Sequence, residues 1–169
     1  MQPEQAYGLA QFLLHNVEQE QKTTRKVLAA VPADKGDYRP DPKSKTAFDL
    51  AWHLAASEQM FARTILEGAL PTGGIPRPED IKTPADVVRY YDEVVAPAKS
   101  GLKTATAEQY AKLIDFHGVF NGPGVIFLNV MLQHSAHHRG QLSVYLRPMG
   151  AKVPSIYGPS GDEEITGRA

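Results

Sequence analysis

The chain contains no cysteine among its 169 residues, although it contains six histidines. The absence of cysteine excludes a disulfide framework, a zinc site built from thiolates and a cysteine nucleophile. Any metal ion that the protein binds must therefore be held by nitrogen and oxygen ligands.

The chain also lacks a strong excess of charge. It has 18 Lys and Arg residues against 19 Asp and Glu residues, a formal net charge of -1, and no run of like charges. Such a balance argues against a general nucleic-acid partner. The N-terminus has no basic segment followed by an apolar run, and no apolar stretch is long enough to cross a bilayer. We therefore expect a cytoplasmic protein with no membrane partner.

The sequence shows no internal repeat, and it lacks the alternation of apolar and polar residues that is typical of β-strands. Instead, apolar residues recur every three or four positions. We expect an all-α fold, a four-helix bundle in a single domain covering residues 1–169. The irregular connection between the second and third helices is long enough to cross from one end of the bundle to the other. The expected helices cover 4–31, 47–66, 84–103 and 123–147, with a crossover at 69–82 and an extended tail at 151–169.

Local signals place several helix ends. Thr46, followed three residues later by Asp49, resembles a capping box, and Thr83 followed by Pro84 marks the start of the third helix. Pro97 lacks a backbone donor, so we expect a kink or a break near Val94. A short helical turn is expected at 106–112.

Three histidines carry the chemistry that the sequence suggests. His134 and His138 are four residues apart on the fourth helix, which places both imidazoles on one face, within reach of one ion. His53 is the candidate third ligand, since it interrupts an apolar face of the second helix, where an unpaired imidazole would be costly to bury. Three ligands leave coordination positions open, as in catalytic sites, and suit zinc, nickel or iron(II).

Alternatives to these assignments stay open at this stage. Histidines at this spacing also arise by chance and then serve as hydrogen-bonded core or surface residues. His137 competes with His138 as the second choice of ligand. Gln141 lies on the same face of the fourth helix as His134 and His138, so it could orient a ligand or form a helix–helix hydrogen bond. We expect Glu58 to be solvated or to form an inter-helix salt bridge.

These residues resemble those of a known family. The segments Tyr38-Arg-Pro-Asp-Pro-Lys-Ser, Ala51-Trp-His-Leu, His134-Ser-Ala-His-His-Arg-Gly-Gln and Pro154-Ser-Ile-Tyr-Gly-Pro-Ser are similar to DinB-like proteins, which are related to YfiT-type metalloenzymes. The resemblance implies a four-helix bundle, often a homodimer. It also implies a divalent ion held at the positions of His53, His134 and His138.

Three functions are compatible with such a site. The resemblance implies an enzyme that acts on a small molecule, with thiol-dependent S-transfer from a low-molecular-weight thiol as the leading hypothesis. The second is a non-enzymatic metal-binding protein of the stress response. The third is a metal-dependent hydrolase, for which folding would have to bring Glu18, Glu58 or Asp92 to the site as the general base.

Overall fold

The structure is a computed structural model that describes residues 1–164, and its fold is mostly helical with one small sheet. None of its helices within that range is long and apolar enough to cross a membrane. The elements in chain order are α1 (Pro3–Ala29), the 3-10 turn η1 (Ala33–Lys35), α2 (Ala47–Glu67), α3 (Pro84–Tyr90), the π-helix η2 (Tyr91–Val95), α4 (Ala96–Gly101), the 3-10 turn η3 (Leu102–Thr104), α5 (Ala107–Ala111), β1 (Leu113–Phe116), β2 (Phe120–Pro123) and α6 (Gly124–Leu146).

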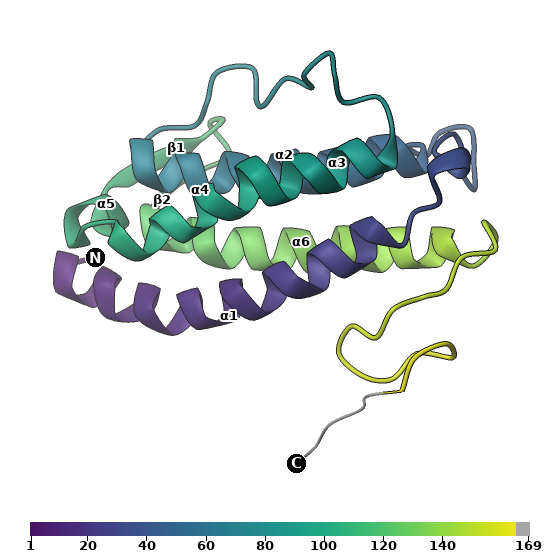
Figure 1. The fold of residues 1–169 in the computed structure, drawn as a ribbon. Coiled ribbons are helices and arrows are strands. Elements are labelled where there is room, and N and C mark those ends of the chain that lie inside the picture. The colour runs from purple at the N-terminus through teal and green to yellow at the C-terminus, as the bar shows by residue number, and fades with distance from the viewer. Residues whose placement is uncertain (165–169) are drawn as a thin grey trace.

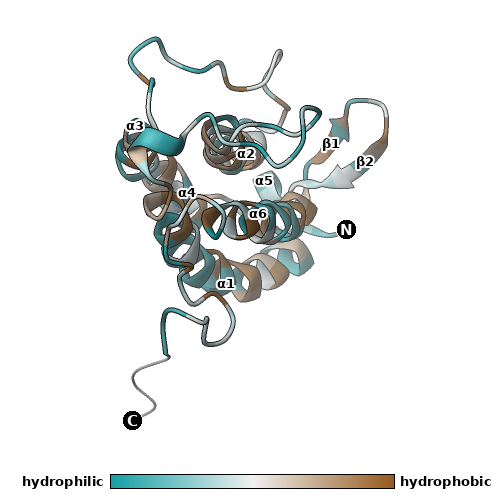
Figure 2. Cartoon of the chain, turned by 90° about the vertical axis from the view of Figure 1, so that its right-hand side faces the viewer, coloured by the Kyte–Doolittle hydropathy of each residue, from teal (hydrophilic) through white to brown (hydrophobic). Residues whose placement is uncertain are grey.

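The long helices run side by side, and the connection between α2 and α3 determines their directions (Figure 1). Residues 68–83 form no helix or strand and pass back along the length of α2, as the sequence predicts for a crossover. As a result, α2 and the α3–α4 run point the same way, opposite to α1 and α6. Viewed along the helices, α6 lies between α1 and α2 (Figure 2).

The ends of α2 follow from local chemistry. The hydroxyl oxygen of Thr46 accepts a hydrogen bond from the backbone N–H of Asp49 at 3.0 Å, which satisfies one of the free donors of the first turn. Gly68 ends the helix with φ of 70°, a left-handed conformation that favours glycine. Both ends agree with the sequence prediction within one residue.

The third helical region is continuous but changes from α-helix to π-helix and back. It begins as predicted, with Thr83 as the cap of α3 and Pro84 at its first position. The π-helix η2 then occupies Tyr91–Val95, directly before Pro97. Proline cannot donate the hydrogen bond that a regular α-helix would need there, and the wider turn accommodates that loss. Where a kink or a break was expected near Val94, the structure has a π-helical turn, and the backbone stays helical on both sides of it.

The small sheet corrects the expectation that the chain has no strands. β1 and β2 pair antiparallel, with Phe116 opposite Phe120. His117 and Gly118 both have positive φ, 53° and 71°, as a tight hairpin turn requires. Four-residue strands are too short to show a clear alternation in sequence. The His117-Gly118 pair between Phe116 and Phe120 was the feature of the sequence that could have indicated the hairpin turn.

The interior of the protein contains two apolar clusters separated by a polar layer. One cluster includes Phe61 and Met131, and the other includes Leu54 and Leu142. The buried polar side chains between these clusters belong to four helices, and they are Thr24, Glu58, Lys99, Ser135 and Arg139.

The centre of this layer is a buried ion pair. The Nζ of Lys99 donates to Glu58 Oε2 at 2.6 Å, and the hydroxyls of Tyr91 and Thr24 donate to the same carboxylate at 2.6 and 3.0 Å. Burial would raise the pKa of Glu58, but the charge and hydrogen bonds of Lys99 and Tyr91 outweigh it and lower that pKa. Of the two roles expected for Glu58, the inter-helix salt bridge is the one observed.

The tail has no helix or strand between residues 151 and 164. Arg147 holds it through Asp162 at 2.8 Å, and the hydroxyl of Tyr157 donates to Glu20 Oε2 at 2.9 Å. The guanidinium of Arg139 donates to the same hydroxyl at 2.5 Å. The described part of the tail is therefore attached to α1 and α6.

Replacing Lys99 by methionine should destabilise the protein strongly, because the Glu58 carboxylate would remain buried without its cation. The expected loss in the free energy of unfolding is about 3–5 kcal/mol. A matched control is Arg63→Met, which removes an exposed i, i+4 pair with Glu67 and should cost less than about 1 kcal/mol. Urea denaturation of both variants measures the difference, and equal losses would contradict the role assigned to the buried pair.

Candidate metal centre

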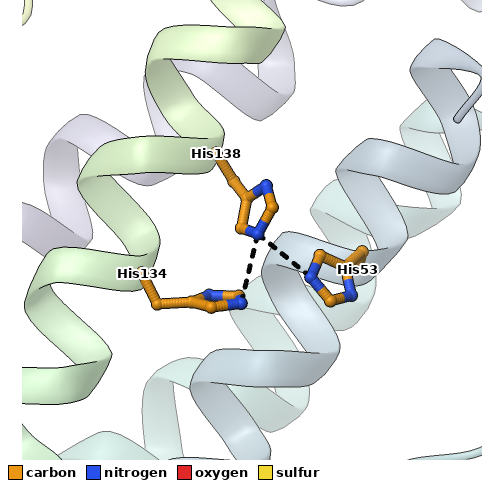
Figure 3. Close-up of side chains that lie close together, drawn as sticks. All are labelled: His53, His134 and His138. Carbon is orange, nitrogen blue, oxygen red and sulfur yellow. Dashed lines mark hydrogen bonds between the residues drawn. The ribbon is translucent and has the colours of Figure 1, made fainter. Parts of the chain in front are cut away.

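The three histidines predicted as ligands converge between α2 and α6 (Figure 3). His53 lies in the second turn of α2, and His134 and His138 lie one turn apart on α6. The Nε2 atom of His138 is 3.1 Å from Nε2 of His53 and 3.1 Å from Nε2 of His134. One nitrogen from each ring lies within 4.8 Å of the other two. All three side chains are half-buried.

The hydrogen-bonding capacity of these rings shows that they fit a cation. His138 Nδ1 lies 2.7 Å from Gln141 Oε1. An amide oxygen only accepts, so Nδ1 of His138 carries the ring proton and its Nε2 presents a lone pair. That single lone pair faces two further imidazole nitrogens, which cannot both donate to it well. A shared positive ion resolves this arrangement.

The spacing of the nitrogens also fits one ion. Two nitrogen ligands at the usual zinc distance, in tetrahedral geometry, lie about 3.3 Å apart. Two of the three nitrogen separations are 3.1 Å, close to this value, and all three nitrogens lie within 4.8 Å of one another. The donor set therefore suits a divalent ion of the borderline type.

The protonation state of the three imidazole rings also favours metal binding. Burial, followed by the nearby His138 imidazole, lowers the pKa of His53 to about 4. Burial and the neighbouring histidines likewise lower the pKa of His134 to about 4. Burial also lowers the pKa of His138, although its hydrogen bond to Gln141 acts in the opposite direction. Near neutral pH the rings are uncharged, which is the form that binds metal ions.

The other histidines are not part of this group. His137, the second choice as a ligand, is exposed, and its ring meets His138 edge-on at 4.9 Å between centroids. The group of potential metal ligands found within residues 1–164 does not include it. His15 and His117 are also outside the group.

A cavity of about 650 Å³ lies alongside His53 and His134. Trp52 lines it and also packs edge-on against Tyr90 at 5.0 Å between ring centroids. The tail residue Tyr157 lines a different cavity, against α1. The described part of the tail therefore does not cover the histidines.

The carboxylates considered as general bases are engaged elsewhere. Glu18 pairs with Lys103, Glu58 with Lys99, and Asp92 with Arg25. Folding brings none of them into the histidine group. The carboxylate that lines the cavity is that of Asp49, one turn before His53 on α2. Its i, i+4 spacing from His53 was the signal that the sequence analysis missed.

Other residues of the cavity could not be identified from the sequence. Lys45 precedes α2, Arg77 belongs to the crossover and Phe116 to the hairpin. Lys45 is separated from His53 by eight positions, whereas Arg77 and Phe116 come from segments far from the ligands along the chain. Their approach depends on how these segments fold back over α2.

Comparisons with known proteins show which family the chain is similar to. A model of the DinB family matches residues 1–166. The Bacillus subtilis protein YjoA is 30% identical over 147 residues, covering 84% of this chain and 88% of YjoA. The Bacillus subtilis protein YrdA is 31% identical over 154 residues, covering 89% of each chain. Both relatives are described as uncharacterized.

Solved structures have the same fold. A crystal structure of the DinB-like YjoA from Bacillus subtilis matches with a TM-score of 0.69 at 24% identity, covering 85% of this chain and 96% of that one. A DinB-like protein from Bacillus cereus matches with a TM-score of 0.71 at 24% identity, covering 86% and 95%. At this identity the likeness concerns the fold. Together with the match of the family model over nearly all of the sequence, it shows that this chain belongs to the DinB family and has a DinB-like fold.

Proposed function

We propose that the protein binds one divalent metal ion through His53, His134 and His138 and acts as a metal-dependent enzyme on a small molecule. The observation that carries this proposal is the convergence of the three imidazole nitrogens beside a cavity of about 650 Å³. Zinc, nickel and iron(II) all accept such nitrogen ligands. Gln141 would hold the His138 ring in the orientation that binding requires.

Catalysis is favoured over a purely structural role because the group of potential ligands found within residues 1–164 has three members. Structural zinc sites close all four positions with protein side chains, whereas catalytic sites keep one open. Here the open side of the ion would face the cavity, into which a substrate can diffuse. The half-burial of the rings shields the ligands in part from bulk water.

Thiol-dependent transfer is the leading reaction. A divalent ion at this site would lower the pKa of a thiol that binds there and so supply a thiolate nucleophile near neutral pH. The chain has no cysteine, so the nucleophile would come from a low-molecular-weight thiol in solution. The protein's own contribution is then to hold the ion and to position both reactants in the cavity.

Two alternatives remain as hypotheses. A non-enzymatic metal-binding protein of the stress response would need the same ligands but no substrate cavity. A hydrolase would need a general base, and Asp49 is the carboxylate that lines the cavity. Its pairing with Arg77 at 3.0 Å favours a role in binding over one in proton transfer.

Metal binding should depend on each of the three histidines. We expect the wild-type chain to bind one Zn²⁺, and His53→Ala and His138→Ala to lower the affinity at least about 100-fold. His137→Ala, next to His138 on the same helix, is the matched control and should bind as the wild type does. Isothermal titration calorimetry with Zn²⁺ measures all four proteins, and unchanged affinity in the two ligand variants would contradict the proposed site.

Gln141 should affect metal affinity without being a ligand. Gln141→Ala removes the acceptor for His138 Nδ1 and should weaken Zn²⁺ binding about 10- to 100-fold. Gln141→Glu keeps an acceptor oxygen at the same reach and should restore most of the affinity. The same calorimetric titration gives the comparison. If alanine and glutamate behave identically, the hydrogen bond does not orient the ring.

The enzyme hypothesis predicts metal-dependent consumption of thiol. Zn²⁺-loaded protein mixed with a panel of low-molecular-weight thiols and monochlorobimane should form the bimane conjugate faster than metal-free protein does. His53→Ala should lose this acceleration and His137→Ala should keep it. The fluorescence of the conjugate follows the reaction. Equal rates with loaded and metal-free protein, across the panel, would rule out the transferase proposal.

A further inference from the structure

The cavity beside the histidines extends along one face of α2. Asp49, His53, Ser57 and Phe61 follow one another at intervals of four residues and all line it. At 1.5 Å per residue, Asp49 lies about 6 Å before His53 along the helix axis and Phe61 about 12 Å after it. The candidate metal centre is therefore between the two ends of an elongated cavity, and the two ends differ in chemistry.

The end near the start of α2 is cationic. Lys45 and Arg77 line it, together with one carboxylate, Asp49. Arg77 donates to Asp49 at 3.0 Å, and its guanidinium lies 4.7 Å from the centre of the Phe48 ring. Within residues 1–164, Lys45 takes part in no ion pair. One positive charge is thus left without a protein partner at this end.

The positive character of this end comes from side chains and not from the helix terminus. The backbone N–H of Ala47 donates to the carbonyl of Tyr38 at 2.7 Å, and that of Phe48 donates to the carbonyl of Gly36 at 2.9 Å. Because the first-turn donors of α2 are already used, an anion here would be bound by Lys45 and Arg77.

The opposite end is apolar and aromatic. Met60, Phe61 and Phe116 line it. The rings of Phe61 and Phe116 are stacked, with their centroids 6.4 Å apart, and Phe61 meets His134 edge-on at 5.6 Å. The side chains named at this end carry no charge, so burial of an apolar group is favoured here.

We propose that this cavity binds a small amphiphilic anion, with its acidic group on Lys45 and Arg77 and its apolar group against Met60, Phe61 and Phe116. The histidines lie between these two contacts, where the reacting atom would sit. The inference rests on the proposed metal-dependent function for the identity of that reacting centre. The substrate class is therefore a carboxylate or another acid that carries an aromatic or aliphatic body.

Three probes separate the two contacts. Phenylhexanoate has both the acid and the ring, phenylhexanol has the ring without the charge, and hexanoate has the charge without the ring. Trp52 is the only tryptophan of the chain and lines the cavity, so its fluorescence reports binding. Titrations use the full chain, both metal-free and Zn²⁺-loaded. In the metal-free titration the carboxylate of the probe has no ion to bind, so any preference for the acid must come from the protein.

We expect phenylhexanoate to bind at least about tenfold more tightly than either partial probe in both forms. Lys45→Ala and Arg77→Ala should each weaken phenylhexanoate about threefold to tenfold and leave phenylhexanol unchanged. Asp49→Asn should strengthen phenylhexanoate binding, because it removes the carboxylate that competes for Arg77. A gain of binding cannot result from misfolding, so this variant separates charge from structural damage.

Two controls complete the design. Lys43→Ala removes an exposed lysine that does not line the cavity, and it should bind every probe as the wild type does. Met60→Ala should weaken phenylhexanol and phenylhexanoate alike and leave hexanoate unchanged. Equal affinity of the wild type for acid and alcohol, or an unchanged preference in both Lys45→Ala and Arg77→Ala, would overturn the proposal.

Failure of the proposed ligand class can be distinguished from failure of the proposed enzyme function. If Zn²⁺ and phenylhexanoate bind as expected but thiol is not consumed, the transferase proposal fails and the assigned ligand class stands. If thiol is consumed with no preference for acids, the transferase proposal stands and the ligand class is wrong. Loss of probe binding in variants that still bind Zn²⁺ normally would assign the effect to the cavity and not to the metal ligands.

Discussion

The close packing of α2 against α6 is the constraint on which the rest of the structure depends. It brings His53 within 3.1 Å of His138, although 85 residues separate them along the chain. Along the helix axes, one apolar cluster lies on each side of the polar layer near the histidines, and the two clusters hold the helices together. The histidines therefore occupy a position that the core fixes from both directions, which limits how far their nitrogens can move apart.

The buried polar layer lies near the histidines along the helix axes, since Ser135 and Arg139 alternate with His134 and His138 on α6. Glu58 and Lys99 form an ion pair whose side chains are 1% and 3% exposed, and Arg139 is completely buried. Polar groups in such a position stabilise a fold only when nearly all of their hydrogen bonds are formed. The layer thus requires one alignment of α1, α2, α4 and α6, and that alignment also sets the positions of His53, His134 and His138.

Successive faces of α6 perform different tasks. His134 and His138 point toward His53 on α2, and His134 also lines the cavity, whereas Arg139 points toward α1 and binds Glu20 and Tyr157. One helix therefore connects the candidate metal centre to the attachment of the tail. Because α6 lies between α1 and α2, it can contact both.

The sequence by itself determined those features that depend on neighbours a few residues apart. The helix ends at Thr46 and Gly68, the irregular helical turn before Pro97 and the alignment of His134 with His138 all follow from geometry within one or two helical turns. His53 was identified because an imidazole in an apolar face needs a partner. The hairpin was missed because its strands are short and depend on pairing with each other.

Only the tertiary structure decided which residues surround the site. Leu9 and Phe12 fit the apolar period of α1 but face outward, while the small residues Ala6 and Ala10 are buried. Lys45, Arg77 and Phe116 meet at one cavity although they come from three separate segments. Such contacts depend on packing between distant parts of the chain, which local propensity does not encode, whereas the spacing of ligands on a single helix is set by the helix itself.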